Sequence, residues 1–362
     1  MRCSQTPAAR ARLRTSPVED ADGIQNPVLL IGGYGVLGEQ LARTLRKRNP
    51  RLPLVIAGRD VARASAFAAE LGDAKGVAFE LDPANAPLPD GAFSAVVLLV
   101  KDETLRVTDA AGKRGIPLIT CSTAAFEVGP DLFHGLRARG APVVLGGHWF
   151  AGAPTIVALA LSAGFFRVDE IDVGLVIDRS ETGSGPATAA DFERITSACP
   201  STLIRTKGRY RWVQGHAARA SFEREDGSTA QGSIAVSTDV LSLTAASGAS
   251  SVRVIEAFTP SLSLQRGKGA ADEVNIRISG IGLDGKAREV RQYVTASRSG
   301  TPLTALTLAV AIERLIGELG DQALAPGLYP LDATVDPDVF VAILKKAGVR
   351  FSAPSERRAK RA

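Results

Sequence analysis

The chain has 362 residues, more than one ordinary hydrophobic core accommodates, so two domains are expected. Hydrophobic residues make up 45% and charged residues 22%, as in globular proteins. The formal net charge is +5, but residues 353–362 supply most of it, which argues against a nucleic-acid-binding surface. No apolar run reaches the ~18 residues of a membrane-spanning helix. The three cysteines show neither a disulfide framework nor a metal-binding spacing.

Both ends of the chain are predicted to be disordered tails, residues 1–26 and the basic residues 353–362. The first carries several arginines but lacks the apolar stretch of a secretory signal. A reducing, cytoplasmic location is therefore expected, with no membrane partner.

The stretch VLLIGGYGVLGEQL, residues 28–41, carries the most specific motif. Its four apolar residues predict a strand buried on both faces, and the spaced leucines that follow predict a helix. Gly33, Gly35 and Gly38 have the GxGxxG spacing, which provides a tight turn, close backbone approach to a pyrophosphate, and close helix–strand packing, respectively. The residues predicted to contact a dinucleotide here are Gly33, Tyr34, Gly35, Val36, Leu37 and Gly38.

The next strand, LPLVIAGRD, ends on Gly58 and Arg59, where cofactors with a free ribose 2′-hydroxyl usually meet an acidic residue. A guanidinium suits a 2′-phosphate instead, and Arg63 lies one helical turn further on. Asp60 is an alternative ribose partner, although it also stands where the N-cap of the helix VARASAFAAEL is expected. We therefore predict NADP(H) as the cofactor.

Further strands, VAFELD, FSAVVLLV, IPLIT and APVVLGG, alternate with helical patterns. This alternation predicts an α/β fold, a doubly wound parallel sheet of about six strands of the Rossmann type, over residues 27–150. Ligands of such sheets bind at the carboxyl ends of the strands. The residues at those ends are Asp82, expected near the adenine, Lys101, Cys121, Ser122, His148 and Trp149.

The second half, residues 151–300, has a different pattern. Strand-like arms flank Asp226-Gly227 and Asp284-Gly285, and Asp-Gly between such arms is a strong hairpin signal. We predict a mostly antiparallel sheet with α+β character, serving as the substrate and dimerisation domain. Helices return over residues 301–352, with Asp336 as an N-cap before Pro337, and we expect them to complete the first domain.

The segment LIRTKGRYRWVQGH alternates basic residues with others. On one strand this spacing directs Arg205, Lys207, Arg209 and Arg211 to a single face. We predict that Arg205 and Arg209, with Trp149, contact a carboxylate-bearing substrate; the alternative is a solvated sheet face. The loop RSETGSGPAT, residues 179–188, is either a cover over the substrate or a plain linker.

Several segments resemble the saccharopine dehydrogenase-like family. GGYGVLGEQLARTL and VIAGRD resemble its NADP-binding domain, and APGLYPLDATVDPDVFVAILKKAGV is similar to its C-terminal signature. VVLGGHWFAGAPTIVALAL and GSGPATAADFERI are similar to its connecting segments, so the resemblance spans about residues 27–352. It implies a two-domain NADP(H) oxidoreductase, usually a homodimer, that forms or cleaves a C–N bond by hydride transfer to an imine. His148 and Trp149 stand where many relatives carry smaller residues.

Two residues are predicted to be catalytic. His148 is a candidate proton donor because the pKa of histidine lies near neutral pH; the alternative is a hydrogen-bonded structural histidine. Lys101 follows an apolar strand, where desolvation would lower its pKa; the alternative is an ordinary solvated lysine. Cys121 has no evident base nearby, which argues against a nucleophile.

Three functions remain open from the sequence. The first is an NADP(H) oxidoreductase acting on a C–N bond of a small carboxylate-bearing substrate. The second is an NADPH-dependent reductase of C=C or C=O in an apolar substrate, and the third is a non-catalytic NADP(H) sensor.

Overall fold

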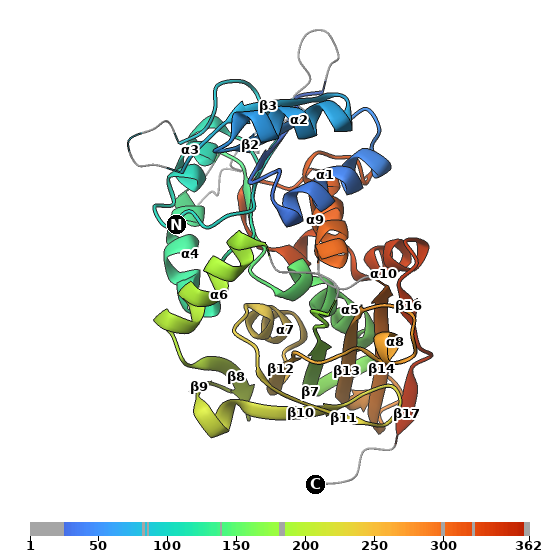
Figure 1. The fold of residues 1–362 in the computed structure, drawn as a ribbon. Coiled ribbons are helices and arrows are strands. Elements are labelled where there is room, and N and C mark those ends of the chain that lie inside the picture. The colour runs from blue at the N-terminus through green and yellow to red at the C-terminus, as the bar shows by residue number, and fades with distance from the viewer. Residues whose placement is uncertain are drawn as a thin grey trace, which may run out of the picture.

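The computed structural model describes residues 25–81, 84, 87–137, 140–180, 185–297, 301–320 and 323–357. Two β-sheets form the framework, one above the other in Figure 1, with helices between and around them. The predicted α/β fold, with one parallel and one mostly antiparallel sheet, is confirmed.

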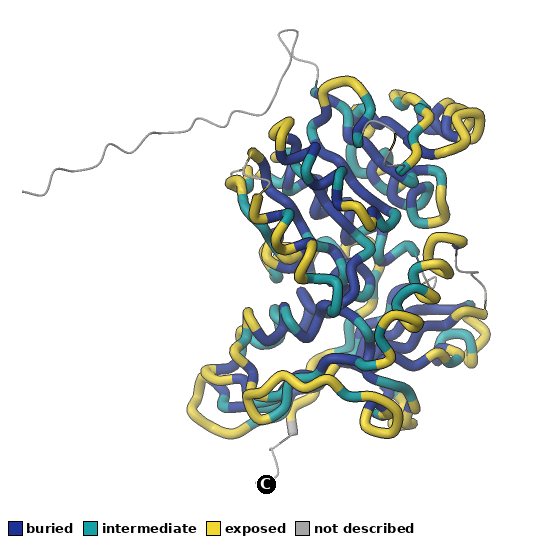
Figure 2. Tube along the Cα trace, turned by 90° about the vertical axis from the view of Figure 1, so that its left-hand side faces the viewer, coloured by how far each residue is buried: buried dark blue, intermediate teal, exposed yellow. Residues whose placement is uncertain are grey.

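The first sheet has seven strands, all parallel, in the order β15-β6-β5-β4-β1-β2-β3. Their bounds are β1 Val28–Ile31, β2 Leu54–Gly58, β3 Ala74–Ala78, β4 Ala95–Leu98, β5 Leu118–Thr120, β6 Pro142–Leu145 and β15 Gly327–Pro330. Strands β1, β2, β4 and β5 are buried along their whole length, whereas β3 and β15 at the two edges are partly exposed; Figure 2 shows the buried centre of the upper half.

Helices cover both faces of this sheet, as a doubly wound fold requires. On one face Val28 and Leu30 pack with α1 (Val36–Arg48), α2 (Val61–Leu71) and α9 (Thr301–Leu315). On the other face Leu29 and Ile31 pack with α3 (Arg106–Arg114). The fully apolar composition of β1 follows from burial on both faces.

Two details of the first sheet differ from the sequence-based expectation. The third strand is β3, three residues earlier than VAFELD, and its Gly76 lies against α2, where a Cβ would come within 2.3 Å of the Ser65 nitrogen. The seventh strand, β15, comes from the C-terminal part and pairs with β6 at the edge. Its sequence GLYP has no alternation and ends in proline, so the pattern gave no signal.

The second sheet has the order β10-β11-β12-β7-β13-β14-β16, with β8, β9 and β17 attached at its margins. Only β7 and β12 pair in parallel within that order. The bounds are β7 Phe165–Val176, β8 Thr202–Thr206, β9 Arg209–Val213, β10 Arg219–Glu223, β11 Thr229–Ile234, β12 Ser251–Ala257, β13 Ala271–Gly282, β14 Ala287–Ser297, β16 Arg350–Phe351 and β17 Ser355–Arg357. The hairpins predicted at Asp226-Gly227 and Asp284-Gly285 are confirmed as β10–β11 and β13–β14.

The remaining helices lie mainly between the sheets. They are α4 Val128–Arg137, α5 Ala153–Ser162, α6 Pro186–Ala198, α7 Asp239–Ser247, α8 Leu262–Gln265 and α10 Pro337–Lys346, with 3-10 turns η1 Ala125–Glu127, η2 Trp149–Gly152, η3 Gly215–Ala218 and η4 Leu331–Thr334. Side chains of α5, α7 and α10 belong to one hydrophobic core with the strands of both sheets. The two halves therefore share a continuous apolar interior.

The C-terminal helices divide between the two halves. Helix α9 packs on α1, and Glu313 accepts hydrogen bonds from Arg48 Nε at 2.7 Å and Arg48 Nη2 at 2.6 Å. Helix α10 packs on α5, and β16 pairs with β14 of the second sheet. Asp336 accepts hydrogen bonds from the backbone nitrogens of Asp338 and Val339, which confirms it as the N-cap of α10. Among the described residues, no helix combines the length and apolarity needed to span a bilayer.

Candidate functional site

The glycine turn lies between β1 and α1, at the carboxyl end of the first strand. Gly32 has φ +84°, so the left-handed residue of the turn is Gly32 rather than Gly33. Gly38 fits only because it lacks a side chain: a Cβ there would come within 2.3 Å of the Gly32 carbonyl oxygen. The helix begins directly after Gly35, so its first N–H groups point to the strand ends, where they suit an anion. Val36 is half-exposed beside them, whereas Leu37 packs against the core.

Gly58, at the tip of β2, lies under the ring of Tyr34. A Cβ at position 58 would come within 2.3 Å of that ring, and the Tyr34 hydroxyl accepts a hydrogen bond of 2.9 Å from the Asp60 backbone nitrogen. Asp60 Oδ1 in turn accepts from the Arg63 backbone nitrogen at 3.0 Å, so Asp60 is the N-cap of α2. The tip of β2 therefore presents an aromatic ring where an acidic residue usually stands.

Two arginines stand beside this tip. Arg59 and Arg63 are both exposed, and the Arg63 guanidinium lies 4.8 Å from the centroid of the Tyr34 ring. The structure thus brings Tyr34, Gly58 and Arg63 together, and Arg59 follows Gly58 in the chain; their contact with a 2′-phosphate stays a prediction. Asp82, predicted near the adenine, lies outside the described residues.

A network of charged side chains occupies the ends of β4 and β5. Lys101 Nζ lies 3.7 Å from Glu127 Oε2 and 3.6 Å from Asp131 Oδ2. Thr123 donates a hydrogen bond of 3.0 Å to Asp131. Burial raises the pKa of Asp131, against the opposing charge of Lys101 and the hydrogen bond from Thr123. Lys101 is accordingly a paired cation on the floor of the site, not an isolated lysine.

Cys121 and Ser122 follow β5 directly. Burial, with the nearby charge of Asp191, raises the pKa of the Cys121 thiol to about 12, so this thiol is not a nucleophile. Arg194 of α6 pairs with Glu127 and with Asp191, and its Nη2 donates to Ser122 Oγ at 3.3 Å.

Helix α6 therefore reaches across the strand ends of the first sheet. Its N-cap, Gly185, lies against Val36 at the glycine turn, where a Cβ would come within 2.9 Å of Val36 Cγ2. Its Arg194, further along, contacts the end of β5. The loop before α6 was predicted to cover a substrate or to link the elements; its residues 181–184 lie outside the described ranges.

His148 does not line this edge. Its side chain is 1% exposed, with Nε2 at 2.7 Å from Ser242 Oγ and 3.4 Å from Asp332 Oδ1. Burial alone would lower its pKa, but the hydrogen bond to Asp332 and the charges of Asp239 and Asp332 raise it. The prediction that His148 donates a proton to a substrate is thus corrected: it joins β6 to α7 and η4 in the interior.

A second group of side chains lies where η2, β7 and β12 end, and of its members the sequence analysis named only Trp149. The Arg179 guanidinium lies 4.1 Å from the Phe258 ring centroid and 5.6 Å from that of Phe192. Trp149 lies 6.4 Å from Phe258, ring centroid to ring centroid. Glu256, on β12, makes a side-chain hydrogen bond with Trp149 and is acted on by the charge of Arg179. We call these five residues the Arg179–Glu256 cluster.

The basic segment of residues 202–213 is a hairpin, not a single strand. Lys207 (φ +47°) and Gly208 (φ +77°) form its turn, so Arg205 pairs with Tyr210 and Arg209 with Thr206. Paired residues share a face, which puts Arg205 and Arg209 on opposite faces. Figure 1 shows β8 and β9 at the lower margin of the second sheet, well below β2 and β3 of the first sheet. The predicted substrate contacts of Arg205 and Arg209 are therefore corrected.

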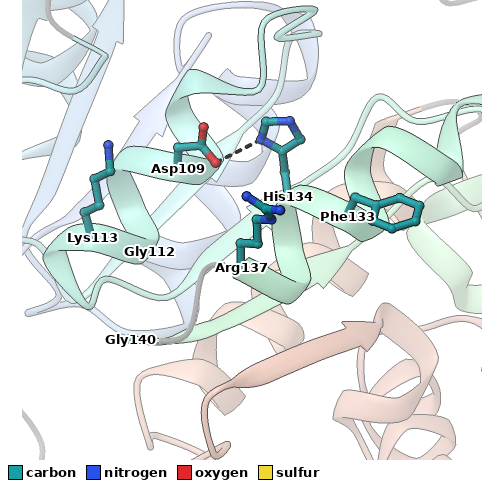
Figure 3. A pocket seen from close by; sticks show the side chains of 7 residues that line it. All are labelled: Asp109, Gly112, Lys113, Phe133, His134, Arg137 and Gly140. Atoms are coloured by element: carbon teal, nitrogen blue, oxygen red, sulfur yellow. Dashed lines mark hydrogen bonds and ion pairs between the residues drawn. The ribbon is translucent and has the colours of Figure 1, made fainter.

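A surface groove between α3 and α4 is shown in Figure 3. It contains a His134–Asp109 pair at 2.9 Å, with Lys113 and Arg137 nearby. Two of its α3 residues, Gly112 and Lys113, come from the last turn of that helix, which ends at the amino edge of the sheet. The groove is thus on the wrong edge for the nucleotide.

Comparisons with known proteins were made with both sequence and structure. No protein-family model and no curated protein matches the sequence. Among solved structures, apo saccharopine dehydrogenase (L-Glu forming) from Saccharomyces cerevisiae has a TM-score of 0.65 at 11% identity, covering 93% of this chain and 100% of that chain. A dehydrogenase from Chromobacterium violaceum has a TM-score of 0.46 at 12% identity, covering 88% of this chain and 93% of that chain. The chain therefore has the fold of a saccharopine dehydrogenase, which is the fold that its sequence resemblance implies.

Proposed function

We propose that this protein is an NADP(H)-dependent oxidoreductase that transfers hydride to or from a C–N bond of a small carboxylate-bearing substrate. The cofactor, when bound, supplies or accepts the hydride. The protein binds and orients the substrate and supplies the proton. The fold, the glycine turn and the sequence resemblance support this proposal together.

The residues at the strand ends fit a dinucleotide. The close approach of Gly38 to Gly32 holds the N-terminus of α1 at the glycine turn, where its N–H groups suit a pyrophosphate. Lys101, Cys121 and Ser122 lie at the ends of the next strands, where the nicotinamide half of such cofactors binds.

The single observation that carries the choice of NADP(H) is the packing of Tyr34 on Gly58. Because the ring fills the space of a side chain at position 58, an acidic ribose ligand has no room there. Arg59 and Arg63 stand beside it, and both present guanidinium groups to the surface. A 2′-phosphate matches this charge better than a free hydroxyl does.

The substrate side of the proposal rests on the Arg179–Glu256 cluster. Arg179 is exposed and its guanidinium packs on Phe258, and an arginine held in this way can bind a carboxylate through its edge N–H groups. It takes the role that the sequence analysis gave to Arg205 and Arg209.

The same cluster also favours the second candidate, reduction of an apolar substrate. Phe192 is 43% and Phe258 is 42% exposed, and with Trp149 they form an aromatic wall. Such a wall suits an apolar or aromatic substrate as well as the stem of a small carboxylate.

We expect Arg59→Ala to weaken NADPH binding by about tenfold or more and to leave NADH binding unchanged. Charge-assisted hydrogen bonds are worth roughly 1.5–3 kcal/mol, and only NADPH carries the 2′-phosphate. Isothermal titration calorimetry with both nucleotides measures the effect. Arg51→Ala, an exposed arginine at the opposite end of β2, is the matched control and should change neither affinity. Equal losses for both nucleotides with Arg59→Ala would show that Arg59 does not contact the phosphate.

A further inference from the structure

Glu256 interrupts an apolar face. Along β12, Val252 and Val254 point into the core between the sheets, and Glu256 is the next residue on that face. It is 8% exposed. Burying a carboxyl group in such a row costs free energy unless the group is hydrogen-bonded or paired. Burial raises the pKa of Glu256 to about 7.

The backbone directly after Trp149, the partner that orients Glu256, is strained. Trp149, which bonds to the Glu256 carboxyl, precedes two non-glycine residues in the left-handed region, Phe150 at φ +48° and Ala151 at φ +51°. The Trp149 backbone nitrogen donates a hydrogen bond of 2.9 Å to Asp239 Oδ2. Strained backbone of this kind persists where the surroundings fix it, and it concentrates at functional sites.

The surroundings of Glu256 differ from those of His148. The polar groups around His148, namely Ser242, Asp239 and Asp332, are all buried. Glu256 instead interacts with Arg179, whose guanidinium packs on Phe192 and Phe258, and these three residues are exposed. Among the described residues, Arg179 is the charged group that acts on Glu256, and it opposes the effect of burial.

We propose that Glu256, oriented by Trp149, is the residue that donates the proton to the substrate, in the place that the sequence analysis gave to His148. This assignment rests on the proposed function.

The balance of the step is simple. In the reducing direction the C=N or C=O carbon gains a hydride, and its π electron pair moves onto the nitrogen or oxygen. That atom takes the proton from the Glu256 carboxyl, which becomes a carboxylate. NADPH, the hydride source, becomes NADP⁺, and Glu256 regains its proton from water. A substrate whose nitrogen carries a permanent positive charge needs no proton from Glu256. Hydride addition neutralises that charge, and no N–H bond has to form.

The first test needs no substrate. In Trp212→Phe protein, Trp149 is the one remaining tryptophan, and its emission should change with a midpoint at about pH 7, set by Glu256. Adding Glu256→Gln should abolish that transition. Adding Arg179→Gln should move it to higher pH, since the arginine charge lowers the pKa of Glu256. A titration without a Glu256-dependent transition near neutral pH overturns the assignment.

The second test compares two carboxylate-bearing probes, the imine 1-pyrroline-2-carboxylate and its permanently charged analogue 1-methyl-1-pyrrolinium-2-carboxylate, by NADPH oxidation. Glu256→Gln should lower turnover of the imine by about 10²-fold, the usual contribution of a positioned general acid. Turnover of the charged analogue and the Kd for NADPH should stay within a few fold. Equal effects on both probes, or none on either, overturn the assignment while leaving the proposed function standing. If the wild-type chain oxidises NADPH with neither probe, the proposed C–N activity fails and the assignment falls with it.

Discussion

Gly38→Ala should destabilise the protein by about 3 kcal/mol, the upper end of the range for overpacked sites, and abolish NADPH binding. The added Cβ would lie 2.3 Å from the Gly32 oxygen and 2.6 Å from the Gly33 carbonyl carbon. Both are backbone atoms of the turn proposed to hold the pyrophosphate, so neither can rotate away as a side chain would. Urea denaturation measures the first effect and calorimetric titration the second.

Gly129→Ala is the matched control for this substitution. Gly129 lies in α4, and a Cβ there meets nothing within 4 Å. Alanine is favoured over glycine within a helix by roughly 0.5–1 kcal/mol, so this variant should be slightly more stable. If Gly38→Ala behaves like Gly129→Ala, the close packing of helix on turn is not present in solution.

Glu313→Ala should cost about 3 kcal/mol of stability. Glu313 is 4% exposed and accepts hydrogen bonds from Arg48 and from Asn49 Nδ2, which links α9 to α1 across the chain. Removing one partner of a buried pair typically costs roughly 3–5 kcal/mol, and the partial exposure of Arg48 places this site at the low end. Urea or thermal denaturation provides the measurement.

Glu70→Ala tests the same type of contact at the surface. Arg43 and Glu70 pair at 2.9 Å, but their side chains are 50% and 61% exposed. Exposed pairs contribute roughly 0–1 kcal/mol. Losses of similar size in the two variants would mean that α9 does not bury Glu313 against the nucleotide-binding half.

The parts of the fold that local sequence determines were predictable. The strand–turn–helix at residues 28–48 needs only apolar residues, glycines at fixed spacing and leucines at helical spacing. The two Asp-Gly hairpins are equally local, since these residues accept the backbone angles of tight turns. The N-cap role of Asp60 also follows from its place before the helix.

Other features depend on residues far apart in sequence. The hairpin at Lys207-Gly208 was missed because a lysine occupies a left-handed position, which the pattern of alternating arginines concealed. His148 stands at a strand end, and only the return of η4 with Asp332 encloses it. Glu256 had a usable signal, a carboxylate in line with Val252 and Val254, but its partners Trp149 and Arg179 come from other elements.

The most direct test of the central claim is calorimetric titration of the unmodified chain with NADPH and with NADH. We predict a single NADPH site with a Kd at least about tenfold lower than that for NADH, because each 1.4 kcal/mol of 2′-phosphate contact is a factor of ten. Tighter binding of NADH, or no heat with either nucleotide, would contradict the account.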